Sequence, residues 1–595
     1  MKKLITLIIV VLTFTACQKD KKQTIPEVAI EENKAFETVL ESYNEDGLKL
    51  NPINATSSGD HRYNDQFPNF LSDDYTQQLK DYYSDYKTKI NSFSDSELSK
   101  SQQLSKQILN WECDINLEGF KYNEHLMPIN QFWSLQLSVG QLASGASAQP
   151  FKTVEDYNNW LKRLDGYLEW MNSAQENMEQ GIKLGYVLPK SLIVKVLPQL
   201  EDLTTTNVEE HLFFEPIKNL PENFSEEDKA KLTETYTQKI KNKIAPAYKK
   251  LHDFMSTTYL KQGRTTSGIS DIPNGEDYYS YQIKKFTTTN MTADEIHELG
   301  LKEVARILSE METVKNQVGY EGDLISFFDF VRTNKELMPF EKPESVIHNF
   351  NEIHDKMKPQ INTLFDLKPI TAFEVRRTEA FREASASAEY NPGSLDGTRP
   401  GIFYVPIPDV TTYNVFTDEA LFLHEAIPGH HFQISLQQEN KALPSFRKTL
   451  WYSAYGEGWA LYCESLGKEL GLYTDPYQYF GMLSMEMHRA IRLVVDTGIH
   501  TKGWSREKAI KYSLKNEAES EASITSEIER YMAMPGQALS YKIGQLKLLE
   551  LRAKAEKELG DKFDVAQFHN QVLESGSMPL ALLETKIDHW IASVK

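Results

Sequence analysis

Most of the chain places apolar residues at the three- and four-residue spacing of an amphipathic helix. One clear example falls on a single helical face and consists of Trp160, Leu161, Leu164, Leu168 and Met171. Similar stretches run from about residue 34 to 290 and predict an N-terminal helical region. Helical patterning also fills most of 291–595, and no internal repeat divides the chain. The patterning therefore predicts a mainly α-helical protein.

The helical pattern is interrupted between about residues 370 and 412. Three short segments rich in strand-forming residues lie there, at 370–375, 384–390 and 402–405, with turn-forming residues between them. We expect a small antiparallel sheet immediately before the segment that carries the candidate chemistry. A strand containing Tyr404 would then be able to bind an extended peptide substrate by strand addition.

The N-terminus carries an export signal. Two lysines precede an apolar run over 4–14 that is too short to span a bilayer, and a small residue then precedes Cys17. The pattern resembles a bacterial lipoprotein signal, in which residues 1–16 are removed and Cys17 becomes the lipidated first residue. Residues 17–33 are polar and aperiodic, as expected of a tether. The alternative is a general secretory signal in which Cys17 has no role.

Length and composition indicate a large globular body. A chain of 595 residues exceeds what one hydrophobic core usually organises, so two lobes or one elongated helical body are expected. The formal charge of −20 and the lack of a lysine- or arginine-rich block argue against a nucleic-acid partner. Beyond the signal only Cys113 and Cys463 remain, so packing must stabilise the fold without a disulfide framework.

Candidate metal ligands are concentrated in the segment His-Glu-Ala-Ile-Pro-Gly-His-His at 424–431. Zinc peptidases with the motif His-Glu-x-x-His bring two histidines to one helical face by a spacing of four. Here the next histidines lie six and seven positions after His424. Pro428 and the glycine after it cannot continue a regular helix. We therefore expect a bulge that takes up two extra residues and returns His430 or His431 to the face of His424.

Two downstream glutamates strengthen the metal hypothesis. Glu457 and Glu464 are seven positions apart, so they share one face of a predicted helix, and they lie among apolar residues. An unpaired charge there would be costly. A metal bound by Glu457, and a hydrogen bond from a ligand histidine to Glu464, would offset that cost. The alternative is an exposed face of an ordinary amphipathic helix.

The His-Glu pair followed by a downstream glutamate resembles the glutamate-type zincins. The chain is most similar to an exported bacterial family catalogued as domain of unknown function 885, marked by His-Glu-Ala-x-Pro-Gly-His-His and Glu-Gly-Trp-Ala, over about 34–595. The resemblance implies a large helical gluzincin-like fold with a deep central cleft, and a catalytic region over 291–595. It also implies one Zn²⁺ per chain, held by His424, His430 and Glu457. His430 is preferred because a Gly-His pair precedes the second ligand in related enzymes, and His431 would then contact a ligand or face the substrate.

The resemblance also implies the residues that complete an active site. Glu425 would act as general base, because it is adjacent to the first ligand. Related zincins use a tyrosine from a late helix to stabilise the oxyanion, and Tyr541 is the first candidate and Tyr531 the second. The backbone amides at 535–537 would hold a substrate carboxylate with help from Arg530.

One further helical face carries polar residues on an otherwise apolar helix: Arg489, Arg492, Asp496 and His500. Arg492 and His500 would bind substrate if this face lines the cleft. The alternative is a structural ion pair between Arg492 and Asp496.

We expect a zinc-dependent peptidase that hydrolyses short peptides with a metal-activated water. Two alternatives stay open, namely a non-catalytic metal- or peptide-binding lipoprotein and a zinc hydrolase of another amide or an ester. The sequence does not distinguish carboxypeptidase, aminopeptidase and dipeptidase modes. The protein should reside at the bacterial cell envelope and contact the membrane only through its N-terminal lipid anchor.

Overall fold

The structure, a computed structural model, describes residues 32–595 except 146, 380–382, 384–385, 396 and 398. The export signal, Cys17 and nearly all of the expected tether lie outside the described residues. The described chain is mainly helical, as the patterning predicts, and includes a three-stranded sheet. Among the described helices, none combines the length and apolar character needed to cross a bilayer.

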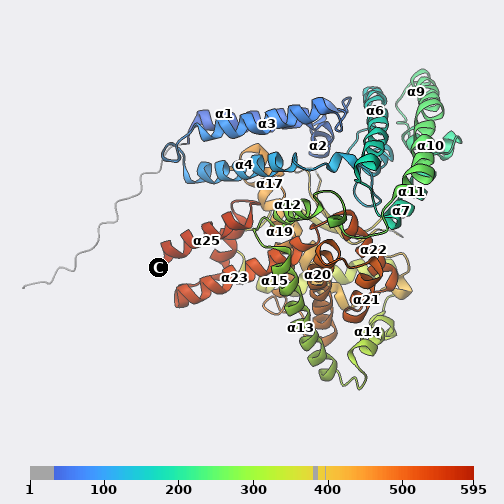
Figure 1. Ribbon diagram of the computed structural model, residues 1–595. Coiled ribbons are helices and arrows are strands. Elements are labelled where there is room, and N and C mark those ends of the chain that lie inside the picture. The colour runs from blue at the N-terminus through green and yellow to red at the C-terminus, as the bar shows by residue number, and fades with distance from the viewer. Residues whose placement is uncertain (1–31, 146, 380–382, 384–385, 396, 398) are drawn as a thin grey trace, which may run out of the picture.

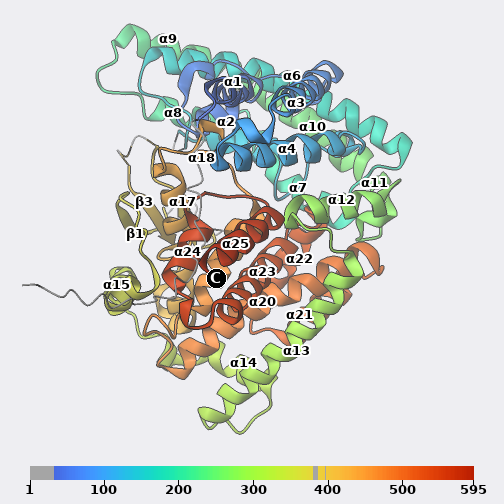
Figure 2. The ribbon, with the colours of Figure 1, turned by 90° about the vertical axis from the view of Figure 1, so that its left-hand side faces the viewer.

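The first helices form a layer along one side of the molecule (Figure 1, Figure 2). Their apolar residues, including Phe36 and Ile108, share one large core with helices from the C-terminal half of the chain. Ser99 and Gln102 form a capping box that fixes the start of the helix leading into this core. The bounds are Lys34–Leu50 (α1), Pro52–Ser57 (α2), Asp73–Asn91 (α3) and Lys100–Gly119 (α4).

The next helices surround a second core of their own. Large aromatic side chains dominate it, and Trp160, Tyr167 and Tyr248 are fully buried there. Figure 1 shows these helices at the far end of the layer from α1. The bounds are Leu135–Ala143 (α5), Val154–Leu184 (α6), Lys190–Glu201 (α7), Glu215–Lys218 (α8), Glu226–Lys239 (α9), Ala245–Phe254 (α10) and Leu260–Gln262 (α11).

The remaining helices form a body on one side of this layer (Figure 2). One long helix, α20, is buried over most of its length, and α13 packs along it. The bounds are Gly275–Thr287 (α12), Ala293–Gln317 (α13), Leu324–Thr333 (α14), Pro343–Leu364 (α15), Asp418–Glu425 (α16), His430–Glu439 (α17), Ser445–Lys448 (α18), Ser453–Ser465 (α19), Pro476–Thr501 (α20), Arg506–Asn516 (α21), Glu521–Ala533 (α22), Leu539–Leu559 (α23), Val565–Leu573 (α24) and Leu580–Val594 (α25).

The small sheet is mixed, so the expectation of an antiparallel sheet was wrong in part. Its strands are Phe373–Arg377 (β1), Glu389–Asn391 (β2) and Gly401–Val405 (β3), in the order β1-β3-β2. β2 pairs antiparallel with β3, whereas β1 pairs parallel with it. The long connection between β1 and β3, which contains β2, supplies the crossover that parallel neighbours require.

The same strand order corrects the interpretation of Tyr404. This residue lies on β3, where it pairs with Arg376 of β1 on one side and Glu389 of β2 on the other. A central strand has no free edge, so a peptide cannot be added to β3.

Two glycines allow α19 and α23 to pack with their backbones in contact. A Cβ added to Gly544 would lie 1.9 Å from the carbonyl oxygen of Ala454 and 2.7 Å from the Cα of Gly458. A Cβ added to Gly458 would in turn lie 2.5 Å from the Cα of Gly544. These distances leave no room for a side chain. The close approach brings Glu457 on α19 and Tyr541 on α23 to the same part of the body.

We predict that Gly544→Ala destabilises the fold by at least about 2 kcal/mol, because the new methyl group forces α19 and α23 apart. The free energy of unfolding measured by denaturant titration checks this. Gly140→Ala is the matched control, since its Cβ would meet only the Leu212 side chain at 3.6 Å. In a helix that control should be neutral or more stable by up to about 1 kcal/mol. Equal stability of both variants would contradict the role given to the glycine contact.

Candidate metal centre

The histidine-rich segment forms two helices and not one bulged helix. α16 ends at Glu425 and α17 begins at His430, with 426–429 between them. The expectation of a bulge was therefore wrong, although the break does lie at the predicted proline and glycine. A Cβ at Gly429 would lie 1.9 Å from the carbonyl oxygen of His424, so glycine alone fits this turn. The carbonyl of Pro428 accepts a hydrogen bond from Trp459 Nε1 at 2.8 Å, which ties the break to α19.

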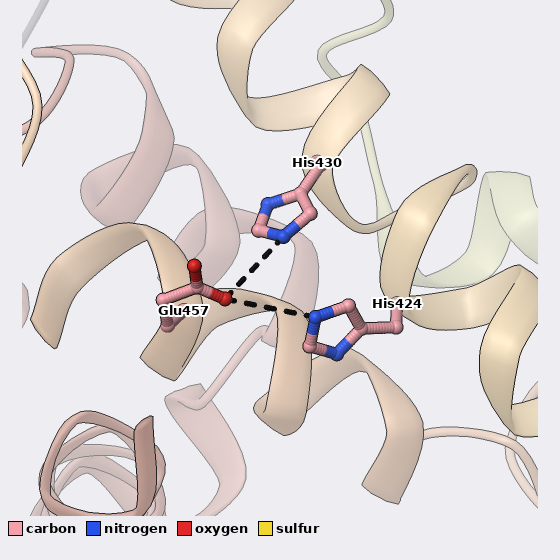
Figure 3. A group of neighbouring side chains, drawn as sticks. All are labelled: His424, His430 and Glu457. Atoms are coloured by element: carbon pink, nitrogen blue, oxygen red, sulfur yellow. Dashed lines mark ion pairs between the residues drawn. The ribbon is translucent and has the colours of Figure 1, made fainter. Parts of the chain in front are cut away.

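The break brings His424, His430 and Glu457 together, as Figure 3 shows. Glu457 Oε2 lies 3.6 Å from His424 Nε2 and 3.5 Å from His430 Nε2. One ligand atom from each of the three residues lies within 4.8 Å of the other two. The three side chains come from α16, α17 and α19, and they are the three residues that the sequence named as candidate metal ligands.

Glu464 orients the first histidine. Its Oε1 lies 2.7 Å from His424 Nδ1 and accepts a hydrogen bond from Nδ1–H, which fixes the ring with Nε2 towards Glu457. Glu464 is buried, with 1% of its surface exposed. This is the contact that the seven-residue spacing of the two glutamates predicted.

Burial and charge act against each other in this cluster. Burial alone would lower the pKa of His424, but hydrogen bonds with Glu457 and Glu464 outweigh it and raise the pKa to about 9. Burial alone would raise the pKa of Glu457, but His424 and His430 outweigh it and hold that pKa well below its usual range. The two carboxylates thus create a site that favours positive charge.

His431 lies outside the cluster. Its Nδ1 is 2.9 Å from the hydroxyl of Tyr390 on β2, and its ring packs against Phe373 of β1 with centroids 4.9 Å apart. Burial lowers the pKa of His431 to about 4. It therefore packs as a neutral side chain between α17 and the sheet, and it does not line the cavity that Glu457 lines.

Glu425, the candidate base, is buried in the last turn of α16. Burial raises the pKa of its carboxyl group, while the nearby His424 and His430 lower it. His424 and His430 therefore act electrostatically on Glu425 as well as on Glu457.

A cavity of about 780 Å³ lies between the N-terminal layer and the body, and Glu457 forms part of its wall. Tyr541 and Arg530 also line it, on the side contributed by the body. Arg530 donates to Gln537 Oε1 at 2.7 Å and to the Tyr541 hydroxyl at 3.4 Å. The structure therefore places the first tyrosine candidate and the predicted arginine on the same cavity as Glu457, a candidate metal ligand.

Tyr531, the second candidate, does not line this cavity. It is 2% exposed, its hydroxyl donates to Glu527 Oε2 at 2.9 Å, and the same hydroxyl accepts from Arg492 Nε at 3.1 Å. These contacts explain Tyr531 as a buried part of an ion-pair network.

The polar face of α20 is structural. His500 is fully buried, accepts from the amide of Ile269 at 3.0 Å and has its Nε2 3.0 Å from the carbonyl oxygen of Tyr531. Burial lowers the pKa of His500 to about 3, which keeps the ring neutral. Its expected contact with substrate was therefore wrong, because both ring nitrogens bond within the core.

Arg492 and Asp496 do not form the structural ion pair that was the alternative to substrate binding, because each has other partners. Arg492 donates to Glu527 Oε2 at 2.9 Å and stacks on the ring of Tyr541, 4.4 Å from its centroid. Asp496 accepts from the amide of Gly536 at 3.1 Å. Since Asp496 already occupies this amide, the backbone at 535–537 is not free to bind a substrate carboxylate as expected.

The sequence reasoning missed several aromatic residues on the cavity wall, among them Phe132, Trp133 and Trp451. These three do not belong to a helix, so helical periodicity gives no signal for them. The available signal was an adjacent Phe-Trp pair in the short irregular segment that precedes α5.

Two solved structures share this fold. One, described as a putative lipoprotein from Colwellia psychrerythraea, is 27% identical and has a TM-score of 0.86, covering 94% of this chain and 99% of its own. The other, described as a putative lipoprotein of unknown function from Shewanella oneidensis, is 17% identical with a TM-score of 0.74. It covers 92% of this chain and 99% of its own, and this likeness shows the fold alone. The comparison with curated proteins found no match.

The family comparison agrees with the motifs. The model for the family described as "Bacterial protein of unknown function (DUF885)" matches residues 52–587, which is most of the chain and includes all three candidate metal ligands. The chain therefore belongs to the DUF885 family of bacterial proteins.

Proposed function

We propose that this protein is a zinc-dependent peptidase that hydrolyses short peptides. The observation that carries the proposal is the convergence of two imidazoles and one carboxylate on one point beside the cavity. The resemblance of the His-Glu helix and the downstream glutamate to glutamate-type zincins supports the same conclusion. The volume of about 780 Å³ is that of a small-ligand site, which favours short peptides as substrates over folded proteins.

The spacing of the ligand atoms fits zinc. Two ligands about 2.1 Å from a tetrahedral ion lie about 3.4 Å apart. Glu457 Oε2 lies 3.5 and 3.6 Å from the two histidine Nε2 atoms. His424, His430 and Glu457 would hold the ion, and the carboxylate of Glu464 would fix the imidazole of His424. A set of two nitrogens and one oxygen is also typical of catalytic zinc.

The surrounding residues have distinct roles in the proposed reaction. Zinc bound there would supply Lewis acidity and lower the pKa of a water molecule. The carboxylate of Glu425 would accept a proton from the attacking water and pass it to the leaving amine. The hydroxyl of Tyr541, positioned by Arg530, would donate a hydrogen bond to the carbonyl oxygen as negative charge develops on it.

The cavity favours catalysis over a purely structural zinc site. Structural zinc is usually closed by four protein ligands, whereas the described residues supply three at this point. Glu457 belongs both to this set and to the cavity wall, so a substrate in the cavity would reach the ligand set. A metal site that served only for folding has no need of such access.

We further propose that the protein is exported and lipid-anchored through Cys17. The apolar N-terminal run followed by an alanine and a cysteine supports this. Both solved structures of the same fold are described as putative lipoproteins. A lipid anchor would place the peptidase at the cell envelope.

We predict about one zinc ion per chain in the purified protein and a loss of most of this zinc in His430→Ala, because the variant lacks one of three ligands. His431→Ala is the matched control, since this neighbouring histidine faces the sheet, and it should retain its zinc. Elemental analysis after dialysis measures both. If only His431→Ala loses metal, the assignment of the second ligand is wrong.

Glu425→Gln should keep its zinc and lose peptide hydrolysis by about 10²- to 10⁴-fold, because glutamine cannot accept the proton of the attacking water. Incubation with a mixed peptide library followed by mass spectrometry measures turnover, and the product ladder distinguishes removal of N-terminal residues, removal of C-terminal residues and cleavage of dipeptides. Glu558→Gln, on the surface end of α23, is the control. Hydrolysis at the parental rate in Glu425→Gln would remove Glu425 from the mechanism.

Tyr541→Phe should lower kcat by about 10²-fold with little change in KM, because its hydroxyl acts mainly on the developing oxyanion. Tyr531→Phe removes the same atom from a tyrosine outside the cavity, and its kcat should stay within about threefold of the parent. Steady-state kinetics on one peptide checks both variants. The reverse ranking would show that Tyr531 is the oxyanion donor.

A further inference from the structure

The cavity exposes aromatic surface that the fold does not use. Phe132, Trp133 and Trp451 are 43%, 70% and 42% exposed, and no other aromatic side chain of the described chain is exposed to a comparable extent. All three line the cavity that includes Glu457. Exposed aromatic surface gathered in a concave site is typical of ligand binding, because a bound apolar group removes it from water.

The loop that carries two of these residues is held in a fixed conformation. Asn130 Oδ1 accepts from the amides of Phe132 and Trp133 at 2.8 and 2.6 Å, and Asn130 Nδ2 donates to the carbonyl of Trp133 at 2.9 Å. Gln131 Nε2 also donates to the carbonyl of Glu529 on α22 at 3.0 Å, which attaches the loop to the body. The backbone of the loop is thus held in place, and it presents the exposed Trp133 side chain at the cavity.

The third aromatic residue marks the metal end of the cavity. The ring of Trp451 lies 5.8 Å from that of His430, measured between centroids. At the other wall, the guanidinium of Arg530 lies 5.1 Å from the ring centroid of Phe132. Aromatic surface therefore lies beside the candidate ligands and also beside a cation.

The cation belongs to a largely buried cluster of charged side chains. Arg530 and Arg492 both donate to Glu527, at 3.2 and 2.9 Å, so two guanidinium groups share one carboxylate. His488 lies between two carboxylates, with its Nε2 3.5 Å from Glu527 Oε2 and its Nδ1 2.6 Å from Glu517 Oε2. Arg530 Nε and Arg492 Nη1 have no hydrogen-bond acceptor among the described residues. Arg530 lines the cavity and shares Glu527 with Arg492, so a ligand carboxylate in the cavity would give it a partner of its own through charge-assisted hydrogen bonds.

We propose that the cavity selects short peptides that have an aromatic side chain and a free C-terminal carboxylate. The carboxylate binds Arg530 at the wall formed by α22 and α23, and the aromatic side chain packs against Phe132 and Trp133 of the N-terminal layer. The inference deepens the proposed function and rests on it, since it names the substrates that the peptidase would prefer. The carboxylate is bound by a side chain and not by the helix-start amide, which Asp496 occupies.

The test measures binding separately from turnover. Calorimetric titration of the zinc-loaded Glu425→Gln protein uses three ligands: acetyl-Gly-Phe, its C-terminal amide, and acetyl-Gly-Ala. We expect acetyl-Gly-Phe to bind at least about tenfold more tightly than either of the others. The amide loses the charged hydrogen bond with Arg530, and the alanine peptide loses the burial of an aromatic side chain. Equal affinity for acid and amide, or for the phenylalanine and alanine peptides, overturns the inference.

Two further substitutions in the same protein assign the selectivity to residues. Arg530→Gln should bring acid and amide within about threefold of each other, and Trp133→Ala should do the same for the phenylalanine and alanine peptides. Arg62→Gln and Ile370→Ala remove an exposed guanidinium and an exposed apolar side chain outside the cavity, and both should keep the parental preferences. A preference for the acid that survives in Arg530→Gln contradicts the carboxylate site.

Turnover of the same peptides by the parent protein separates this inference from the function on which it rests. Preferential binding of acetyl-Gly-Phe without hydrolysis of any peptide supports the recognition site and contradicts the peptidase. Hydrolysis of peptides without preference for an aromatic residue or a free carboxylate supports the peptidase and contradicts the recognition site.

Discussion

The burial of two carboxylates on one face of α19 is the constraint around which the centre of this protein is arranged. Glu457 and Glu464 lie among the apolar side chains of a core helix, where an unpaired negative charge is costly. The chain meets this cost by bringing the imidazoles of His424 and His430, which flank the break between α16 and α17, to the same face. A helix that ran on through 426–429 would leave His430 elsewhere, so the Pro-Gly break and the buried glutamates depend on each other.

The same helix connects the ligands to the cavity. Trp459 bonds the carbonyl of the break, and the backbone contact between Gly458 and Gly544 sets α23 against α19. α23 carries Tyr541, and the preceding helix α22 carries Arg530. Gly458 and the Trp459 indole on α19 thus help to set the positions of side chains on four other helices, α16, α17, α22 and α23. Packing of this kind transmits a change at one position to the others, because protein interiors have little free volume.

Sequence patterns were sufficient for those parts of the site that depend on local spacing. The seven-residue interval between Glu457 and Glu464 predicted a shared face, and the structure shows that face turned toward His424. The position of the helix break followed from Pro428 in the same way. Its form did not, because whether a chain bulges or ends a helix depends on tertiary packing, here the hydrogen bond that Trp459 of α19 donates to the Pro428 carbonyl.

The failures have a common cause, which is contact between residues far apart in sequence. His500 forms hydrogen bonds with Ile269 and Tyr531, which are far from it in sequence. In the sheet, β1 pairs with β3 although β2 lies between them in sequence. Neither contact could be inferred from periodicity alone. The resemblance ranked Tyr541 ahead of Tyr531, but only the tertiary structure shows that Tyr541 lines the cavity whereas Tyr531 does not. The aromatic loop was missed because irregular segments carry no periodic signal.

The cavity has walls of different origin. Glu457, Tyr541 and Arg530 come from the body, whereas Phe132 and Trp133 follow Ile129, which is buried in the separate core of the N-terminal layer. Mutations in that layer can therefore reshape one wall of the cavity while the candidate metal ligands keep their own packing. In evolutionary terms, relatives can change this wall without disturbing the cluster of His424, His430 and Glu457, because the two rest on different cores.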